Sequence, residues 1–143
     1  YLFVASDFGV FVLQRRNGEW IQIRAGLEGK RVTSVTARVG AVLMGTREGI
    51  QRSVDLGQSW WPLNEGLTER HIRWLAYDPD GSGRAVAGTE PAAIFVSRAD
   101  DDTWRECGEV AQLRDEKGWY LPYSPEAGCV RGFAFHGARL CGC

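Results

Sequence analysis

The chain repeats itself at a spacing of about forty residues, and this internal repeat limits the folds open to it more than any other feature. When residues 1–38 are laid over 41–78 without a gap, glycines and tryptophans recur at matching positions, and a third copy follows forty-three or forty-four residues further on. The matched pairs are Gly9 with Gly49, Trp20 with Trp60, Gly26 with Gly66, Leu27 with Leu67, Gly88-Thr89 with Gly45-Thr46, Ile94 with Ile50, Ser97 with Ser53 and Trp104 with Trp60. A period in this range is typical of propeller blades or solenoid units.

The most complete copy of the repeat contains the segment S-x-D-x-G-x-S-W, which runs from Ser53 to Trp60. An aspartate that opens a tight turn accepts hydrogen bonds from backbone N–H groups two or three residues on, so Asp55 is expected to hold a hairpin turn. Gly57 allows a positive φ without a Cβ clash, and the hydroxyls of Ser53 and Ser59 are placed to tie the two strands together. Trp60 then begins the next strand and lays an apolar face over the hairpin.

This segment resembles the Asp-box, or BNR repeat, of sialidase-like, sortilin-like and photosystem-assembly-factor-like β-propellers. The resemblance covers roughly residues 1–107, but only the second copy has the full pattern. Arg15 and Asn17 replace the aspartate and the glycine in the first copy, and Ala99 and Asp101 replace them in the third. The resemblance implies a structural role for the motif, which joins the third and fourth strands of a blade on the rim, away from any central pocket.

Composition agrees with an all-β fold. The chain has 18 glycines, six tryptophans and many valine, isoleucine and threonine residues, and no stretch keeps a period of 3.6. Four strands are expected in each complete repeat, at 32–38, 41–46, 49–54 and 59–64, and again at 71–77, 84–89, 93–98 and 103–107. We therefore expect a β-propeller built from blades of four antiparallel strands.

The chain holds about three blades' worth of sequence. The expected division is an incomplete first blade at 1–27, a second at 28–67, a third at 68–108, an insertion loop at 109–129 and the start of a next blade at 130–140. Propellers typically close with four to eight blades, so three arrangements stay open: a part of a longer propeller, a ring assembled from several chains, or a strand exchange in which 130–135 completes the N-terminal blade. Because open blade edges invite pairing, self-association or the remaining blades of a longer propeller is favoured over an open monomer.

The segment 109–131 is the most site-like part of the sequence. It interrupts the repeat where the second blade passes to the third in about seven residues, 64–71, and long loops in compact repeats often carry function. It gathers aromatic rings, carboxylates and an arginine, which together suit a carbohydrate or a small polar ligand. Alternatively, the rings pack the loop onto the blade edge or form an oligomer contact. The candidate ligand-binding residues are Asp115, Trp119, Tyr120, Tyr123, Glu126, Arg131 and His136.

Catalysis is a weaker hypothesis than binding. Glycoside hydrolysis needs two carboxylates about 5–10 Å apart, or a tyrosine nucleophile with a carboxylate partner. Asp115, Glu116, Glu126 and Tyr120 are candidates, but nothing in the sequence fixes their geometry, and the arginines show no triad signature of a sialidase. We therefore expect a binding or scaffold module for a carbohydrate, a small polar ligand or a protein, with a sialidase-like glycoside hydrolase as the alternative.

Net charge and the lack of long apolar runs narrow the classes of partner that are expected. A net charge of −1 with 24% charged residues gives no electrostatic footprint for nucleic acid. The chain has no run of eighteen apolar residues and no signal peptide, so a soluble chain without a membrane segment is expected, in a compartment that the sequence does not name. His71 is expected to be capped or solvent-facing, and Trp61 and Trp74 are expected to pack in the inter-blade core or at a blade edge.

The four cysteines are grouped late in the chain, and they leave two alternatives open. Cys107 and Cys129 flank the insertion, so they form either a structural pair or two free thiols. Cys141 and Cys143 are too close in sequence for the usual zinc knuckle, and His136 alone does not complete a four-ligand site. No metal site and no cofactor is expected.

Overall fold

The computed structural model describes residues 1–97, 102–119 and 128–135, and these form three antiparallel sheets and one helix. Sheet A consists of β1 (Leu2–Ser6), β2 (Gly9–Arg16) and β3 (Glu19–Gly26). Sheet B consists of β4 (Val32–Arg38), β5 (Ala41–Thr46), β6 (Gly49–Ser53) and β7 (Trp61–Pro62). Sheet C consists of β8 (Ile72–Tyr77), β9 (Ala85–Thr89), β10 (Ile94–Ser97) and β11 (Trp104–Glu106), and α1 (Gly108–Lys117) follows it.

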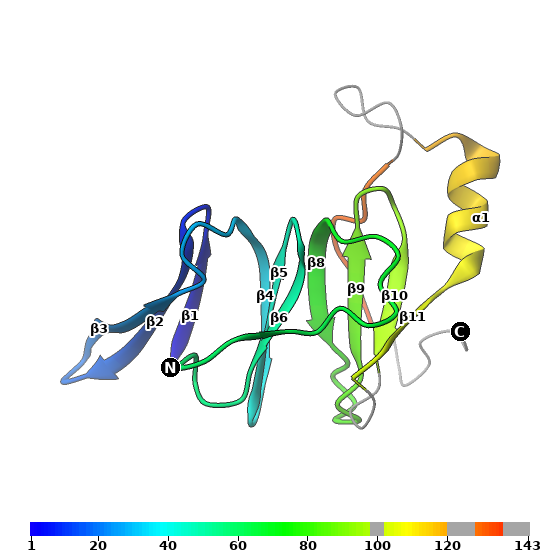
Figure 1. Ribbon diagram of the computed structural model, residues 1–143. Coiled ribbons are helices and arrows are strands. Elements are labelled where there is room, and N and C mark those ends of the chain that lie inside the picture. Colours follow the sequence, from blue (N-terminus) through cyan, green and yellow to red (C-terminus); the bar gives the residue numbers. More distant parts are fainter. Residues whose placement is uncertain (98–101, 120–127, 136–143) are drawn as a thin grey trace.

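The three sheets have the form of propeller blades. Within each sheet the strands are neighbours in chain order, so every blade is a run of hairpins. The sheets stand side by side in the order of the chain, with sheet A on the left of Figure 1 and sheet C on the right. One apolar core lies between sheets A and B, and a larger one lies between sheets B and C. The expected all-β fold of antiparallel blades is confirmed.

Neighbouring blades fit together because a glycine on one faces a bulky side chain on the next. A Cβ added to Gly45 of β5 would lie 2.5 Å from Cγ2 of Ile72 on β8, so only glycine lets the two strands approach this closely. Side chains of β4 also bind the backbone of β8. The Thr33 hydroxyl donates to the Ile72 carbonyl at 2.6 Å, and the Ser34 hydroxyl accepts from the Leu75 N–H at 2.9 Å.

The first strand of each four-stranded blade carries a β-bulge at the same place. The pairing of β4 with β5 shifts between Val32 and Ser34, and the pairing of β8 with β9 shifts between Ile72 and Trp74. A bulge inserts one unpaired residue and turns its side chain away from the regular alternation. The inserted residues are Thr33 and Arg73.

The Asp55 segment forms a closely bonded turn between β6 and β7. The Asp55 carboxylate accepts from the backbone N–H groups of Gln58 and Ser59, both at 3.0 Å, and from the Ser59 hydroxyl at 2.5 Å. The Ser53 hydroxyl donates to the same carboxylate at 2.8 Å and accepts from the Gly57 N–H at 2.8 Å. The hydrogen bonds from Ser59, above all from its hydroxyl, lower the pKa of Asp55 to about 2.

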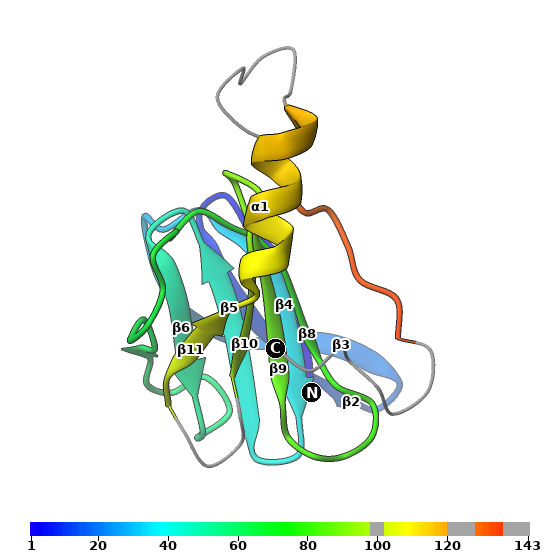
Figure 2. The same ribbon diagram turned by 90° about the vertical axis from the view of Figure 1, so that its right-hand side faces the viewer.

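The sequence predicted a loop over 109–129, but residues 108–117 form helix α1. None of the helical residues is buried, so the helix has no apolar face that the sequence pattern would reveal. Gly118 ends the helix in the left-handed conformation, with φ 58° and its N–H bonded to the Arg114 carbonyl. The helix extends beyond the strands of sheet C (Figures 1 and 2).

Residues 130–135, expected to be a strand, belong to none of the three sheets. Two of their side chains nevertheless contact Gly88 of β9, those of Val130 and Phe133. The Val130 N–H donates to the Thr89 carbonyl at 3.1 Å, and a Cβ added to Gly88 would lie 2.5 Å from Cγ1 of Val130. The segment therefore contacts sheet C, and among the described residues it joins no ladder.

Two further expectations are settled by this part of the chain. Cys107 is disulfide-bonded whereas Cys129 is a free thiol, so the two do not pair with each other. In the described ranges, no helix has the length and apolar character needed to span a membrane.

Candidate functional site

A cavity of about 380 Å³ opens at the starts of the first strands of sheets B and C, and we call it the inner-strand cavity. Its lining comes from four separate parts of the chain: the β1–β2 turn, the start of β4, the start of β8 and the segment after the insertion. The lining residues are Asp7, Val32, Thr33, Arg73, Trp74 and Arg131. A cavity of this size accommodates a small ligand or a few side chains of a partner.

The bulge on β8 places Arg73 on the wall of this cavity. Its Nε lies 3.5 Å from a carboxylate oxygen of Glu90, which holds the side chain loosely. Within the described part of the chain, no hydrogen bond joins its two terminal nitrogens to another residue. A guanidinium group in this state offers donors to a ligand that carries carbonyl or carboxylate oxygens.

Trp74 supplies the apolar surface of the cavity. Its side chain, expected to pack in the inter-blade core or at a blade edge, is 41% exposed and lies on the cavity wall. An exposed tryptophan next to charged groups combines a large stacking area with orientation by hydrogen bonds, which is a common arrangement at binding sites. Asp7 completes the set with the one carboxylate of the described lining.

His71, expected to be capped or solvent-facing, directly precedes β8 and is not among the residues that line the cavity. The residue is partly buried, its carbonyl accepts a hydrogen bond from the Glu90 N–H at 2.9 Å, and its Nε2 has no hydrogen-bond partner among the described residues. Burial lowers the pKa of His71 below its ordinary value of 6.5, although the Glu90 carboxylate acts in the opposite direction. The ring is therefore neutral at pH 7 and adds no charge to the site.

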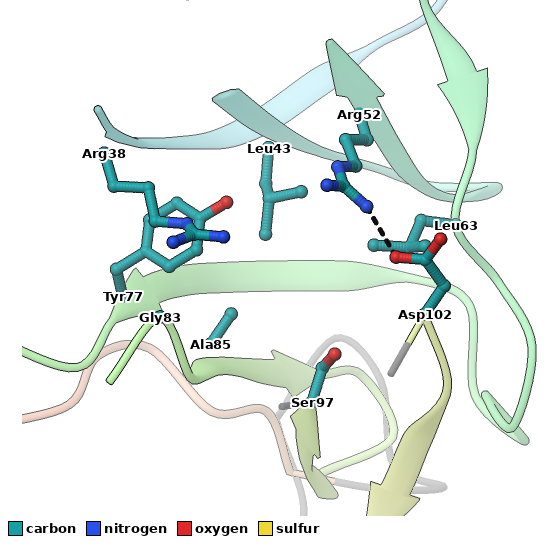
Figure 3. A pocket seen from close by; sticks show the side chains of 9 residues that line it. All are labelled: Arg38, Leu43, Arg52, Leu63, Tyr77, Gly83, Ala85, Ser97 and Asp102. Carbon is teal, nitrogen blue, oxygen red and sulfur yellow. Dashed lines mark hydrogen bonds and ion pairs between the residues drawn. The ribbon is translucent and has the colours of Figure 1, made fainter. Parts of the chain in front are cut away.

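A second hollow lies at the opposite ends of the strands, between sheets B and C, and is shown in Figure 3. Arg52 forms an ion pair with Asp102 at 2.5 Å on one side, and the Arg38 guanidinium lies 5.4 Å from the ring centroid of Tyr77 on the other. The space left between them is about 20 Å³, which is enough for a water molecule and too small for a ligand.

The structure separates the residues that the sequence had grouped in the insertion. Arg131 lines the inner-strand cavity. Asp115 lies on α1, exposed, where its ion pair with Arg114 at 2.7 Å lowers its pKa. Trp119 follows the helix, and its carbonyl accepts from the Gly128 N–H at 2.8 Å. Outside the described residues lie Tyr120, Tyr123, Glu126 and His136.

Asp7, Arg73 and Trp74 were not among the residues that the sequence pattern predicted as a site. They are far apart in the chain, and a bulge that realigns one side chain leaves no trace in the alternation of apolar and polar residues. One available signal was that the alignment of repeats places Arg73 and Trp74 where Thr33 and Ser34 stand in the second copy.

The comparisons with known proteins concern the fold. No family model matches the sequence, and no curated protein matches it. Among solved structures, the chain is similar to YCF48 bound to a D1 peptide, with a TM-score of 0.54 and 19% identity. The fold is a β-propeller. The match covers 72% of this chain but 35% of that chain, so the present propeller segment spans about a third of the YCF48 structure.

Proposed function

We propose that this propeller segment is a protein-binding module and that its inner-strand cavity holds an extended peptide from the partner. The observation that carries the proposal is the exposed ring of Trp74, which shares one cavity with Arg73 and Asp7. No equivalent combination surrounds the second hollow, whose charged groups in the described residues are already paired or stacked.

The lining matches the chemistry of a peptide backbone. An extended peptide presents N–H donors and carbonyl acceptors in alternation, and its side chains project to opposite sides. The Asp7 carboxylate accepts from N–H groups, the Arg73 guanidinium donates to carbonyl oxygens, and the ring of Trp74 takes an apolar side chain. Arg131 adds a second positive charge to the lining.

The comparison with YCF48 supports a peptide over other ligands. That structure contains a D1 peptide, so a propeller of similar fold holds a peptide segment there. A sugar would also stack on Trp74, but nothing beyond the ring favours it. Glycoside hydrolysis is not proposed, because it requires two carboxylates or a tyrosine nucleophile with a carboxylate partner, and the described lining contains one carboxylate, Asp7, and no tyrosine.

A peptide array followed by calorimetry on the best-binding peptide tests the proposal. Trp74→Ala and Arg73→Gln are each expected to weaken binding about tenfold or more, because tryptophan and arginine are the residues whose loss costs most at protein interfaces. Trp61→Ala is the matched control, since Trp61 is an exposed tryptophan on β7 outside the cavity lining. The Trp61→Ala variant is expected to bind the peptide with the affinity of the unmodified chain.

Trp119→Ala separates the cavity from the insertion as the place of binding. If Trp119→Ala abolishes binding while Trp74→Ala leaves it unchanged, the insertion carries recognition and the cavity does not. If a glycan array shows binding and the peptide array shows none, the proposed ligand class is wrong, and the cavity remains the candidate site for the glycan. Turnover of chromogenic glycosides would contradict a purely binding role.

A further inference from the structure

Arg73, which lines the inner-strand cavity, belongs to a group of three side chains at one end of the β8–β9 pair. The other two are His71, directly before β8, and Glu90, directly after β9. The Glu90 N–H donates to the His71 carbonyl at 2.9 Å, next to the pair in which Ile72 is opposite Thr89. The backbone thus holds an imidazole, a guanidinium and a carboxylate within one short stretch of two paired strands.

The Glu90 carboxylate is the anion of this group, and Arg73 binds it weakly. The side chain of Glu90 is 15% exposed, and a carboxylate shielded to this degree needs cations or donors around it. Its contact with Nε of Arg73 is 3.5 Å long, whereas strong charge-assisted hydrogen bonds measure about 2.7–2.9 Å. Among the described residues, no hydrogen bond and no closer ion pair engages this carboxylate. The carboxylate therefore has the capacity to bind a second cation.

His71 is the group that becomes a second cation when it takes up a proton. Its Nε2 is shielded from solvent and has no hydrogen-bond partner in the part of the chain that the structure describes. An imidazolium carries an N–H donor on both nitrogens together with a charge, and a shielded charge needs an acceptor.

Three charged groups act on the His71 ring, and one of them is an acceptor. Burial lowers the pKa of His71 below 6.5; the Glu90 carboxylate raises this pKa, whereas the guanidinium groups of Arg73 and Arg47 lower it. Glu90 follows β9, Arg73 is on β8, and Arg47 is in the β5–β6 turn of the preceding blade. A charged His71 ring is therefore attracted to Glu90 and repelled by the two arginines.

A blade does not require this group of side chains. At the three matching positions of the second repeat, sheet B has neither a carboxylate nor an imidazole. The residues there are Arg31, Thr33 and Arg47. Sheet B nevertheless has the same bulge and the same order of four strands as sheet C. The group on sheet C is thus not needed to build the fold, and its link to the cavity through Arg73 points to a role in binding.

We propose that His71 and Arg73 share the Glu90 carboxylate, so that charging His71 draws the carboxylate away from Arg73 and the cavity binds its peptide more tightly at acid pH. This inference rests on the proposed function, because the peptide is the ligand that Arg73 receives. Arg73 lines the cavity, whereas His71 and Glu90 do not. His71 and Glu90 are therefore positioning residues that act through Arg73.

The affinity is expected to rise as the pH falls through the range in which His71 takes up a proton. At pH 7.5 the ring is neutral, and Glu90 has Arg73 as its cationic partner. As the pH falls from 6.5 toward 5, a charged ring competes for the same carboxylate, and Arg73 directs its donors to the carbonyl oxygens of the peptide. Glutamate side chains ordinarily take up protons near pH 4.3, below this range.

Calorimetry at two pH values, with one histidine-free peptide from the array, tests the effect on binding. The unmodified chain is expected to bind about two- to fivefold more tightly at pH 5 than at pH 7.5, a modest factor because a long, partly exposed ion pair is weak. His71→Gln removes the titrating ring and is expected to keep the lower affinity at both pH values. Glu90→Gln leaves Arg73 without its carboxylate and is expected to give the higher affinity at both.

Glu48→Gln is the matched control for these variants. Glu48 is a turn glutamate of the preceding blade that pairs with Lys30 and does not line the cavity, so its replacement is expected to keep the pH dependence. Binding that weakens toward pH 5, or a pH dependence that survives in His71→Gln, would contradict the proposal. If Glu90→Gln lowers the melting temperature, His71→Gln alone still tests the loss of pH dependence.

An NMR titration of the free chain tests the shared carboxylate without any peptide. His71 and His136 are the two histidines of the sequence, so the ring signal that is lost in His71→Gln belongs to His71. Glu90→Gln is expected to lower the pKa of His71, because the imidazolium loses its acceptor. Arg73→Gln is expected to raise it, because Glu90 then serves His71 alone. A His71 ring that stays neutral down to pH 5, or a pKa that neither variant changes, would overturn the proposal.

The two experiments distinguish a failure of this inference from a failure of the proposed function. If Trp74→Ala weakens peptide binding while the unmodified chain binds equally at pH 7.5 and pH 5, the cavity binds the peptide and the regulation by His71 is wrong. If no peptide binds at either pH, the proposed function fails, and the NMR titration alone decides whether the carboxylate is shared.

Discussion

The close contact between Ile72 and Gly45 predicts how the effects of two substitutions on the free energy of unfolding combine. Ile72 is fully buried between sheets B and C, so Ile72→Ala removes apolar contacts and leaves a cavity, at a cost of about 3 kcal/mol in the free energy of unfolding. Gly45→Ala places a methyl group 2.5 Å from Cγ2 of Ile72, and such overpacking costs about 1–3 kcal/mol.

In the double variant the two costs are not expected to add. Ile72→Ala removes the Cγ2 atom that obstructs the new methyl group, and the remaining neighbours, Cβ of residue 72 at 3.0 Å and Cδ1 of Leu75 at 3.4 Å, need only small shifts. The double variant should therefore be more stable than the sum of the single effects predicts, by about 1–2 kcal/mol.

Urea denaturation of the four proteins measures this coupling. Gly108→Ala is the matched control, because no atom lies within 4 Å of its added Cβ and its φ is not in the left-handed region. It is expected to change stability by less than about 0.5 kcal/mol. Additive effects in the double variant would refute the argument that glycine at position 45 is required by the side chain of the next blade.

Two further predictions follow from hydrogen bonds in the blades. Trp104→Phe removes the donor to the buried Leu63 carbonyl and is expected to cost about 1–3 kcal/mol by urea denaturation; an unchanged midpoint would show that water replaces the bond. The pKa of Asp55 is lowered to about 2 in the folded chain, so the charged carboxylate stabilises the fold above its unfolded pKa, about 4, and this contribution is lost as the pH falls through about 2. The melting temperatures of the unmodified chain and Asp55→Ala are therefore expected to differ most above pH 5 and to converge toward pH 2, and a constant difference would exclude the carboxylate as the cause.

Strand positions were predictable because turn residues bracket each strand. Turns at Gly40, Arg47-Glu48 and Gly83 separate short apolar runs, and the observed strands lie within one or two residues of those expected. The largest differences are β7, expected at 59–64 and shortened to Trp61–Pro62, and residues 130–135, expected to be a strand and found in none of the three sheets. Ser59 is bound to the Asp55 carboxylate, so the turn holds residues that the pattern had assigned to the strand.

The helix and the cavity were not predictable in the same way. Helix α1 buries none of its residues, so it lacks the apolar periodicity by which helices are found. Its sequence of good helix formers, followed by Gly118, was the one local signal. The cavity combines Asp7, Arg73 and Arg131, and residues this far apart in sequence meet only through the packing of the blades.

The β-bulges at the same place in β4 and β8 allow the residues that line the cavity to vary while the buried residues beside them are kept. Each bulge releases one residue from the ladder, Thr33 in one blade and Arg73 in the next, and both line the same cavity. The flanking residues Val32 and Ile72 keep their buried places. A change at Arg73 therefore alters the lining without removing a core residue, whereas Thr33 also ties β4 to β8 through its hydrogen bond to the Ile72 carbonyl. In a propeller of this kind, the bulged residue at the start of a blade can differ from blade to blade while the buried residues beside it stay apolar.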